Sequence, residues 1–232
     1  MVCSSGVGFD PRIDDETYTF DVAGLYNGLF VMSDRLTGSI WTHFDGTVLA
    51  GPLAGTGVGL EIQPLIHLRW EDWLADYPDS EVLAWDERFA DRYREYEPGR
   101  TGLGPEFLRT LLLTDDRLPE AELVLGVESN GATAAYVLSA VDGLTVLNDT
   151  IGETPVVVIV DPDTLFGIAY SAEVGGNVRS FSAGDGQLID ESGSVWALDG
   201  SGADGQLAFV TSFVTEWYGW VAYHPATAIV PG

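Results

Sequence analysis

The chain has 232 residues, of which 46% are hydrophobic and 20% are charged, and this composition is sufficient for a packed core rather than a disordered chain. Asp and Glu number 36 against ten cationic residues, which gives a formal net charge of −26. Such a charge repels nucleic acid and anionic membranes, so we expect no nucleic-acid partner. No stretch approaches the roughly 18 apolar residues that a spanning helix needs. We therefore expect a soluble protein without a membrane span.

The acidic residues are spread along the whole chain, and lysine is absent. This pattern is typical of proteins that work in high salt, where repulsion is screened and a hydrated acidic shell maintains solubility. A coding bias for Arg over Lys, combined with ordinary acidity, is the alternative. The N-terminus lacks the basic and apolar regions of a signal peptide. Two locations are therefore expected as alternatives. The protein is either cytoplasmic in a high-salt organism or exported with a leader that this chain does not include.

The sequence contains few cysteines and histidines that could bind a metal ion. Cys3 is the single cysteine, which excludes an internal disulfide and any zinc site built from several cysteines. The three histidines, His43, His67 and His224, are far apart in the sequence. A metal site would therefore rely mainly on carboxylates, and the sequence leaves the cofactor and the small-molecule ligand unidentified.

Strand patterns dominate the chain. Residues 17–22 alternate polar and apolar side chains, which predicts a half-buried strand, and residues 70–77 have tryptophans at helical spacing. Residues 86–123 predict a partly helical linker. The β-branched run at 156–160 predicts a buried strand, and residues 217–223 repeat the helical tryptophan pattern.

Two tryptophan motifs occur twice in the same order. Residues 37–41 recur at 192–196, an offset of 155, and Trp70-x-x-Trp73 recurs as Trp217-x-x-Trp220, an offset of 147. We therefore expect a mainly β fold of two related halves, barrel- or sandwich-like, each closed by a short tryptophan-bearing helix. The expected boundaries are a first β repeat at 1–85, a linker at 86–123 and a second β repeat at 124–232.

The first repeat has no residues that correspond to the N-terminal segment of the second repeat. The stretch that precedes Trp41 is much shorter than the stretch from Val124 to Trp196. The difference of about 32 residues corresponds to about three or four strands with their turns. Either the chain is truncated or the first half never contained them. Their absence leaves a strand edge that needs cover, which predicts a homo-oligomer through the N-terminal half.

Several segments occur in a recognisable order: Asp34-Arg35-Leu36-Thr37-Gly38-Ser39-Ile40-Trp41, Gly51-Pro52-Leu53-Ala54-Gly55, Trp70-Glu71-Asp72-Trp73, Tyr77-Pro78-Asp79-Ser80-Glu81-Val82-Leu83, Asn148-Asp149-Thr150-Ile151-Gly152-Glu153-Thr154-Pro155-Val156, and residues 217–225. Together they resemble the DUF3179 family, a bacterial and archaeal domain of unknown function, over nearly the whole chain. The resemblance implies that longer members open with a His-containing segment leading into Cys-x-x-Cys-Gly. Cys3 resembles the second cysteine of that element, so a Cys/His site of the family would be only a remnant here.

Three residues are candidates for catalysis. His43 follows Trp41 by two residues, which places both side chains on one face of a strand. With Asp34 or Asp45 nearby, His43 can act as a base, or it can stack on a ligand together with Trp41. Cys3 is a candidate nucleophile or metal ligand, and the alternative is a small strand residue left over from a lost motif.

Asp34 and Arg35 allow two interpretations. Asp34 can serve as a general acid or base while Arg35 binds an anionic group. Alternatively, the segment is a turn in which the Asp and Thr side chains satisfy backbone N–H groups. The second repeat keeps Asp190 but carries Glu191 near the position of Arg35. A turn survives that change and an anion site does not, which favours the turn.

Asn148 and Asp149 are candidate ligand-binding residues, and an Asx-turn before Pro155 is the alternative. The tryptophans of both helical segments are interpreted as core anchors. Two functions remain open. The first is a binding or structural module for a small ligand or a protein partner. The second is a hydrolytic or metal-assisted enzyme that uses Asp34, His43 and possibly Cys3.

Overall fold

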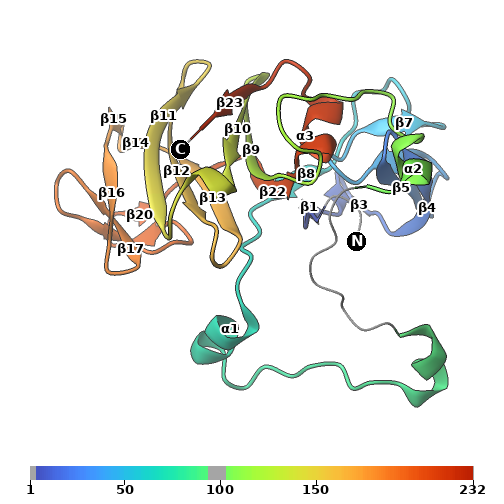
Figure 1. Cartoon of the computed structure of the whole chain (residues 1–232), viewed down its shortest axis with the longest axis horizontal. Helices are drawn as coiled ribbons and strands as arrows, with labels where there is room; N and C mark the ends of the chain where they lie inside the picture. Colours follow the sequence, from blue (N-terminus) through green and yellow to red (C-terminus); the bar gives the residue numbers. More distant parts are fainter. Residues whose placement is uncertain (1–3, 94–102, 232) are drawn as a thin grey trace.

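A computed structural model describes residues 4–93 and 103–231 of the chain, and the mainly β architecture expected from the sequence is confirmed (Figure 1). The N-terminal part contains the strands β1 (Gly8–Asp10), β2 (Arg12–Ile13), β3 (Glu16–Thr17), β4 (Phe20–Tyr26), β5 (Leu29–Asp34), β6 (Ile40–Thr42), β7 (Val48–Ala50) and β8 (Glu61–Gln63). It continues into the helix α1 (Trp70–Asp76), the 3-10 helix η1 (Glu87–Arg92) and the helix α2 (Pro105–Leu108).

The C-terminal part begins at β9 (Leu123–Ser129). Its further elements are β10 (Ala132–Val137), η2 (Leu138–Ala140), β11 (Thr145–Ile151), β12 (Thr154–Asp161), β13 (Phe166–Ser171), β14 (Glu173–Val174), β15 (Asn177–Val178), β16 (Phe181–Gly184), β17 (Gln187–Asp190), β18 (Val195–Trp196), β19 (Ser201–Gly202), β20 (Gly205–Gln206), β21 (Phe209–Val210), β22 (Ser212–Glu216), α3 (Trp217–Tyr223) and β23 (Ala228–Val230). In the described ranges no helix is long and apolar enough to cross a bilayer.

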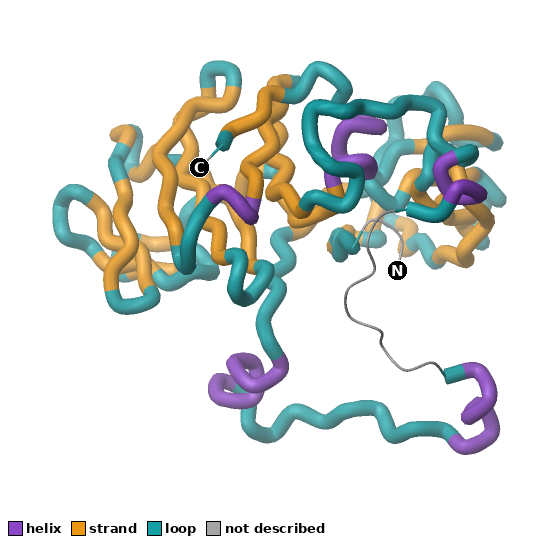
Figure 2. The backbone as a smooth tube through the Cα atoms, viewed as in Figure 1, coloured by secondary structure: helices purple, strands orange, loops and turns teal. Residues whose placement is uncertain are grey.

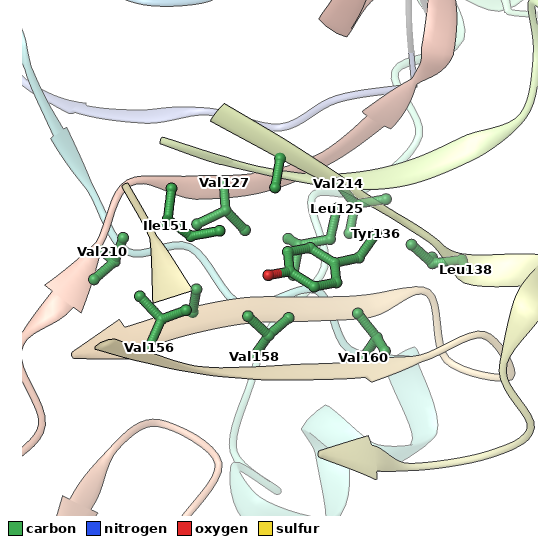
Figure 3. Packing of buried hydrophobic residues seen from close by; sticks show 12 residues of the cluster. Leu125, Val127, Tyr136, Leu138, Ile151, Val156, Val158, Val160, Val210 and Val214 are labelled. Carbon is green, nitrogen blue, oxygen red and sulfur yellow. The ribbon is translucent and has the colours of Figure 1, made fainter. Parts of the chain in front are cut away.

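The sheets of the C-terminal part are stacked and open, as in a sandwich rather than a barrel. The strand orders are β22-β9-β10-β23, β11-β12-β13-β21 and β16-β17-β18-β19-β20. The apolar core between the first two sheets contains Leu125 and Tyr136 on one side and Val156 and Val158 on the other (Figure 3). Because β12 lies between two cores, all of its central residues are buried, which confirms the buried strand predicted at 156–160.

The N-terminal part is built on the sheet β4-β5-β6-β7, with β1 paired to β8 and β2 paired to β3. The strand predicted at 17–22 is interrupted. Thr17 ends β3, Tyr18 is buried against Trp41, and β4 begins at Phe20. Val22 is 77% exposed, because β4 is an edge strand with a bulge after Val22 and its side chains are largely uncovered.

Helix α3 joins the two parts. Its buried residues Trp217 and Trp220 belong to an apolar cluster with Phe213 from β22 and with Leu29 and Phe44 from the N-terminal part. Phe44 lies 4.8 Å from the Phe213 ring and 5.9 Å from the Trp220 ring, measured between ring centroids. The expectation that the tryptophans of this helix anchor the core is therefore confirmed.

Helix α1, unlike α3, does not pack into the core. It lies on a segment that projects from the sheets (Figure 2), and Trp70 and Trp73 are 49% and 40% exposed. The expectation that these two tryptophans anchor the core is wrong, and α1 does not close the N-terminal half. The reason is that α3 lies beside β9 and β22, whereas among the described residues no pair of strands covers α1 in the same way.

The two tryptophan helices nevertheless share their local geometry. Trp73 donates its indole N–H to the Ser80 hydroxyl at 2.7 Å, and Trp220 donates to the Thr227 hydroxyl at 3.0 Å, each seven residues further along. The residue after α1 has φ −127° and ψ 68°, and the residue after α3 has φ −124° and ψ 63°. The sequence similarity of the two segments thus extends to backbone conformation and hydrogen bonding.

The order of elements is similar in the two parts, although the two sheets compared below have four and five strands. Along the N-terminal part, the β2–β3 hairpin precedes the sheet β4-β5-β6-β7. Along the C-terminal part, the β14–β15 hairpin likewise precedes the sheet β16-β17-β18-β19-β20. The β1–β8 pair corresponds to the antiparallel β13–β21 pair, and α1 corresponds to α3. Strands β9 to β12 have no counterpart ahead of β1 in the described residues.

The expected linker is partly helical, because η1 and α2 lie within residues 86–123. Its residues 94–102 are outside the described ranges. Arg117, near its end, donates to the backbone carbonyls of Thr227 and Pro225 at 2.9 and 3.0 Å. The guanidinium also lies over the Trp217 ring, 5.1 Å from its centroid. These contacts fasten the end of the linker to the C-terminal part. The boundaries of the two repeats stay a prediction.

Candidate functional site

Asp34 stands at the end of β5 and organises the turn into β6. The side chain is almost fully buried and accepts hydrogen bonds from the Thr37 backbone N–H and hydroxyl, from the Ser39 N–H at 3.0 Å, and from the Trp41 indole at 2.8 Å. Burial alone raises the pKa of this carboxyl, but the hydrogen bonds from Trp41, Thr37 and Ser39 outweigh it and hold the pKa below its usual range. Asp34 is thus an ionised acceptor inside a turn.

Asp190, at the end of β17, makes the same turn in the C-terminal part. It accepts from the Ser192 N–H at 2.9 Å and hydroxyl at 2.6 Å, from the Ser194 N–H at 3.0 Å, and from the Trp196 indole at 3.2 Å. Burial raises the pKa of Asp190, while bonds from Ser192, Arg179 and Trp196 lower it well below the usual range. The interpretation of the Asp34 segment as a turn with side-chain capping is confirmed.

Arg35 is turned toward solvent. Its guanidinium pairs with Asp21 through two hydrogen bonds of 2.8 and 2.6 Å, and the pair is exposed. The backbone N–H of Arg35 donates to the Thr19 carbonyl at 2.9 Å, as the N–H of Glu191 donates to the Ser180 carbonyl at 3.0 Å. The two turns share this backbone hydrogen bond but use the side chain differently, because the Glu191 carboxylate also accepts from the Ser180 N–H at 2.7 Å whereas Arg35 pairs with Asp21.

His43 is 5% exposed and lies in an aromatic environment. Its ring stacks on Phe30 at a centroid distance of 3.8 Å, and Nδ1 donates to the Phe30 carbonyl at 2.7 Å. Burial lowers the pKa of His43, opposed by the bond to Phe30 and by the charge of Asp45. Trp41 packs instead against Tyr18 and other residues of a different cluster. The two side chains do not share one stacking surface, because β6 ends before His43.

Asn148 and Asp149 lie within β11, so the turn expected at these residues is wrong, and the chain reverses after Ile151 instead. Asn148 donates its side-chain amide to the Phe181 carbonyl at 2.8 Å and accepts from the Phe181 N–H at 2.7 Å. Because the amide reproduces the pairing of a backbone, it joins β11 to β16. Asp149 accepts from the Tyr136 hydroxyl at 2.7 Å. The Cys3 candidate lies outside the described residues.

The predicted residues thus fall at separate places rather than in one site. A different concave feature lies between the two parts of the chain, with a volume of about 500 Å³. We refer to it as the acidic cleft. Its walls are formed by the loop after β6, by β8, by the end of β9 with the following turn, and by β21: Asp45, Leu60, Glu61, Ile62, Glu128, Ser129, Asn130, Phe209, Val210 and Thr211.

Three carboxylates line the acidic cleft, and its described lining includes no cationic side chain. Asp45 is held in place because its Oδ1 accepts from the Thr47 N–H at 3.1 Å and hydroxyl at 2.8 Å, and also from the Thr42 hydroxyl. Glu128 is half-buried, and its backbone N–H donates to the Thr211 carbonyl at 2.9 Å. Burial and then the negative charge of Asp45 raise the pKa of Glu128.

Two neutral histidines lie within the electrostatic influence of Asp45. The ring of His224 packs on Trp220 with 4.1 Å between ring centroids, and burial lowers the pKa of His224 to about 4 against the opposing charge of Asp45. Burial also lowers the pKa of His43, and the negative charge of Asp45 opposes that shift. At neutral pH both rings are uncharged, so they do not neutralise the carboxylates of the cleft. The cleft is therefore suited to a positively charged group.

Sequence inspection identified Asp45 only as a neighbour of His43 and did not identify Glu61 or Glu128. Asp45 and Glu128 belong to different halves of the chain, and each looks like an ordinary polar residue near the end of a strand. Within the described part of the chain, no three His, Cys, Asp or Glu side chains are grouped so as to hold a metal ion.

A scan against family models matches residues 1–227 to a family described as a protein of unknown function, DUF3179. Searches of curated proteins and of solved structures found no match. The matched residues include the motifs that suggested the resemblance, among them both tryptophan helices and the Asp34 turn. The chain belongs to the DUF3179 family.

Proposed function

We propose that this chain is a binding module that holds a positively charged group of a small organic ligand in the acidic cleft. The observation that carries the proposal is the meeting of Asp45, Glu61 and Glu128 around one cleft whose described lining has no counter-charge. Carboxylates bind ammonium and guanidinium groups through charge-assisted hydrogen bonds, which are stronger than neutral ones.

The other walls of the cleft favour an organic cation. Leu60, Ile62, Phe209 and Val210 contribute to the lining, and apolar side chains bury the carbon skeleton of a ligand. The volume of about 500 Å³ falls within the range that is usual for small-molecule sites. The expected ligand class is therefore an amine or a guanidinium compound with a short apolar body.

The hydrolytic alternative centred on His43 and Asp34 is less well supported. The oxygens of Asp34 accept hydrogen bonds within its own turn, and the ring of His43, whose Nδ1 donates to a backbone carbonyl, is only 5% exposed, which limits the access of a substrate to the lone pair on Nε2. A general base needs a lone pair that can reach a substrate proton. Binding by the acidic cleft requires neither residue to leave its present partners.

We also propose that the chain arose from two copies of one β unit. The matched order of elements, the repeated aspartate turn and the repeated tryptophan helix support this origin. In this view the acidic cleft lies where the copies meet, so its residues were free to diverge from the shared framework.

Binding of methylguanidine and propylamine, measured by isothermal titration calorimetry at fixed ionic strength, tests the proposed site. Replacing Asp45 by Asn or Glu128 by Gln is expected to weaken binding about tenfold each, equivalent to about 1.4 kcal/mol. Propanol, which has no charge, is expected not to bind. The matched control is Glu173→Gln, an exposed carboxylate of β14, for which affinity should stay unchanged. Equal affinities in all variants would contradict the proposal.

A further inference from the structure

The core of the N-terminal part is covered less completely than the matching core of the C-terminal part. The apolar cluster around Trp196 contains ten buried residues, whereas the cluster around Trp41 contains three in the ranges that the structure describes. Phe20 and Met32 pack against the Trp41 cluster and are only partly buried. One side of the N-terminal core is therefore incompletely covered.

The register of the strands shows which residues of the two cores correspond. Phe20 stands opposite Asp34 in the β4–β5 pair, and Phe181 stands opposite Asp190 in the β16–β17 pair. Each phenylalanine ring also meets the tryptophan of its aspartate turn edge to face, with 5.7 and 6.5 Å between ring centroids. Phe181 is buried, whereas Phe20 is only partly buried. The two residues hold the same place in the fold and differ in what covers them.

The C-terminal part shows what covers this place. Asn148 of β11 donates its amide to the Phe181 carbonyl at 2.8 Å and accepts from the Phe181 N–H at 2.7 Å. Val157 and Ile159 of β12, both 0% exposed, belong to the cluster around Trp196. Strands β11 and β12 form an antiparallel hairpin. The cover is thus a hairpin with an asparagine in its first strand and β-branched residues along one face of its second.

Strand β4 has an open outer edge at Phe20. The Asp34 N–H donates to the Ser39 carbonyl, and the Arg35 N–H donates to the Thr19 carbonyl. Phe20 and Asp34 are therefore a non-hydrogen-bonded pair, so the N–H and C=O of Phe20 point away from β5. Within the described ranges β4 pairs only with β5, and it lies on the side of the N-terminal part that faces away from the C-terminal sheets (Figure 1). An edge of this kind can receive an added strand.

We propose that the open edge of β4 binds a β-hairpin of a separate polypeptide, which completes the N-terminal core as β11 and β12 complete the C-terminal one. An asparagine in the first strand of that hairpin pairs with the N–H and C=O of Phe20. The β-branched side chains of its second strand pack on the cluster that includes Phe20 and Met32. Recognition by strand addition combines hydrogen bonds to the backbone with selective contacts of alternate side chains.

A second copy of this chain does not supply the hairpin, because each copy already uses its own. Asn148 is bonded to Phe181, and Val157 and Ile159 are buried, so a donating copy would open its own core. The homo-oligomer expected from the sequence is the competing occupant of the edge. The inference rests on the correspondence of the two parts and not on the acidic cleft, so a cleft that binds no amine leaves it intact.

A synthetic hairpin with the sequence of residues 143–162 is the probe. Val156→Thr, Val158→Thr and Val160→Thr are introduced in every peptide, because these three side chains face a different core in the chain and would be exposed in the complex. Titration of the labelled peptide with the full chain in molar salt, followed by fluorescence anisotropy, is expected to show saturable binding. High salt screens the repulsion between the acidic peptide and the acidic chain.

Hydrogen exchange of single amides locates the bound peptide. The exchange of the Phe20 amide is expected to slow on binding, because its N–H gains an acceptor. The Phe181 amide already donates to Asn148, so its exchange is expected to stay unchanged. Slower exchange at Phe181 instead of Phe20 would show that the peptide replaces the chain's own hairpin, and this result overturns the proposal.

Two variants of the peptide test the role of the asparagine. Asn148→Asp removes the amide donor, and it is expected to weaken binding about tenfold, the effect of one lost hydrogen bond. The matched control is Asp149→Asn, because the next side chain along a strand points to the opposite face, where Asp149 accepts from Tyr136 in the chain. Its affinity is expected to stay unchanged. Equal affinities of both variants overturn the proposal.

A covalent fusion of the same hairpin to the N-terminus of the full chain, through a flexible linker, makes the test independent of the affinity of a free peptide. The fusion is expected to raise the melting temperature and to protect the Phe20 amide, and Asn148→Asp within the fused hairpin is expected to remove most of this gain. A fusion that changes neither overturns the proposal. So does light scattering that shows a dimer of the unfused chain which the peptide dissociates, because a second copy then occupies the edge.

Discussion

At the scale of single residues, the two buried aspartates are structural. Asp34 and Asp190 each close a turn by accepting backbone N–H groups and the indole of a tryptophan in the next strand. Gly38 and Gly193 have φ of 74° and 85° in these turns, a conformation that favours glycine. The closing of these turns by the aspartates explains the spacing of Asp, Gly, Ser and Trp without any catalytic requirement.

His224 gives a pH dependence of stability. Its pKa in the folded chain, about 4, lies below the ordinary value of 6.5, so the unfolded chain binds the proton first as pH falls. The stabilisation is complete above pH 6.5 and is lost progressively toward pH 4, to an extent on the order of 3 kcal/mol. The free energy of unfolding is therefore expected to fall between pH 7 and pH 5, which denaturant titrations measure.

The variant His224→Tyr separates this contribution from those of other groups. Tyrosine occupies the corresponding position after α1 and stays neutral over the same pH range, so the variant is expected to lose less stability than the wild type. His43 continues to contribute in the variant, because burial also lowers its pKa. An identical loss in both proteins would show that His224 does not titrate as described.

The sequence predicted the role of Asp34 because the turn is a local structure, formed between the ends of two neighbouring strands. It did not predict the surroundings of His43. We expected Trp41 and His43 to lie on one face of a strand, which requires β6 to include His43. Strand β6 instead ends at Thr42. The ring then packs on Phe30, from the neighbouring strand β5, and on Phe44. Asn148 was misassigned for a related reason, since its amide completes a contact with β16 rather than a local turn.

At the scale of elements, one glycine allows α3 to lie on β9. A Cβ at Gly126 would stand 2.2 Å from Cε3 of Trp220. Gly126→Ala is therefore expected to displace Trp220 and to destabilise the fold by about 1–3 kcal/mol, the usual effect of overpacking a core. Chemical denaturation measures the loss, and near-ultraviolet circular dichroism reports the displaced tryptophan.

Gly24→Ala is the matched control, because a Cβ at this strand glycine meets nothing within 4 Å. We expect a change within about 0.5 kcal/mol. If Gly126→Ala were tolerated equally well, the α3–β9 contact would have to be looser than the geometry indicates.

Elements buried on both sides were the easiest to predict. The run at 156–160 is apolar at every position because β12 has a core on each face. By contrast, β4 is exposed along most of its length, and the alternation within 17–22 did not correspond to burial. The helix at 70–77 was predicted correctly as a helix. Its exposure was not, because the pattern of an amphipathic helix does not reveal whether a covering sheet is present.

At the scale of the whole molecule, charge is the dominant feature. We propose that the dispersed carboxylates and the absence of lysine adapt the chain to high salt. At low salt a net charge of −26 destabilises the compact state through self-repulsion, which salt screens. The melting temperature is expected to rise from low to molar sodium chloride. A melting temperature independent of salt would remove this interpretation.

The acidic cleft was not predictable from the sequence. Its carboxylates come from the loop after β6, from β8 and from β9, and they meet only when the N-terminal and C-terminal parts pack together through Phe44 and α3. No spacing rule links these positions, whereas the repeated motifs within each part were visible as spacings of tryptophan and glycine.

The strand order β22-β9-β10-β23 has a consequence for synthesis on the ribosome. Strand β9 is complete at Ser129, but one of its two neighbours is β22, which begins at Ser212, and β10 receives its outer partner only with β23. The edge of β9, with its valine and leucine side chains, therefore stays unpaired while residues 130–211 are synthesised. Leu29 and Phe44 stay uncovered even longer, because the tryptophans that cover them belong to α3. Both parts of the molecule thus reach their final packing together, only after α3 and β23 have been translated.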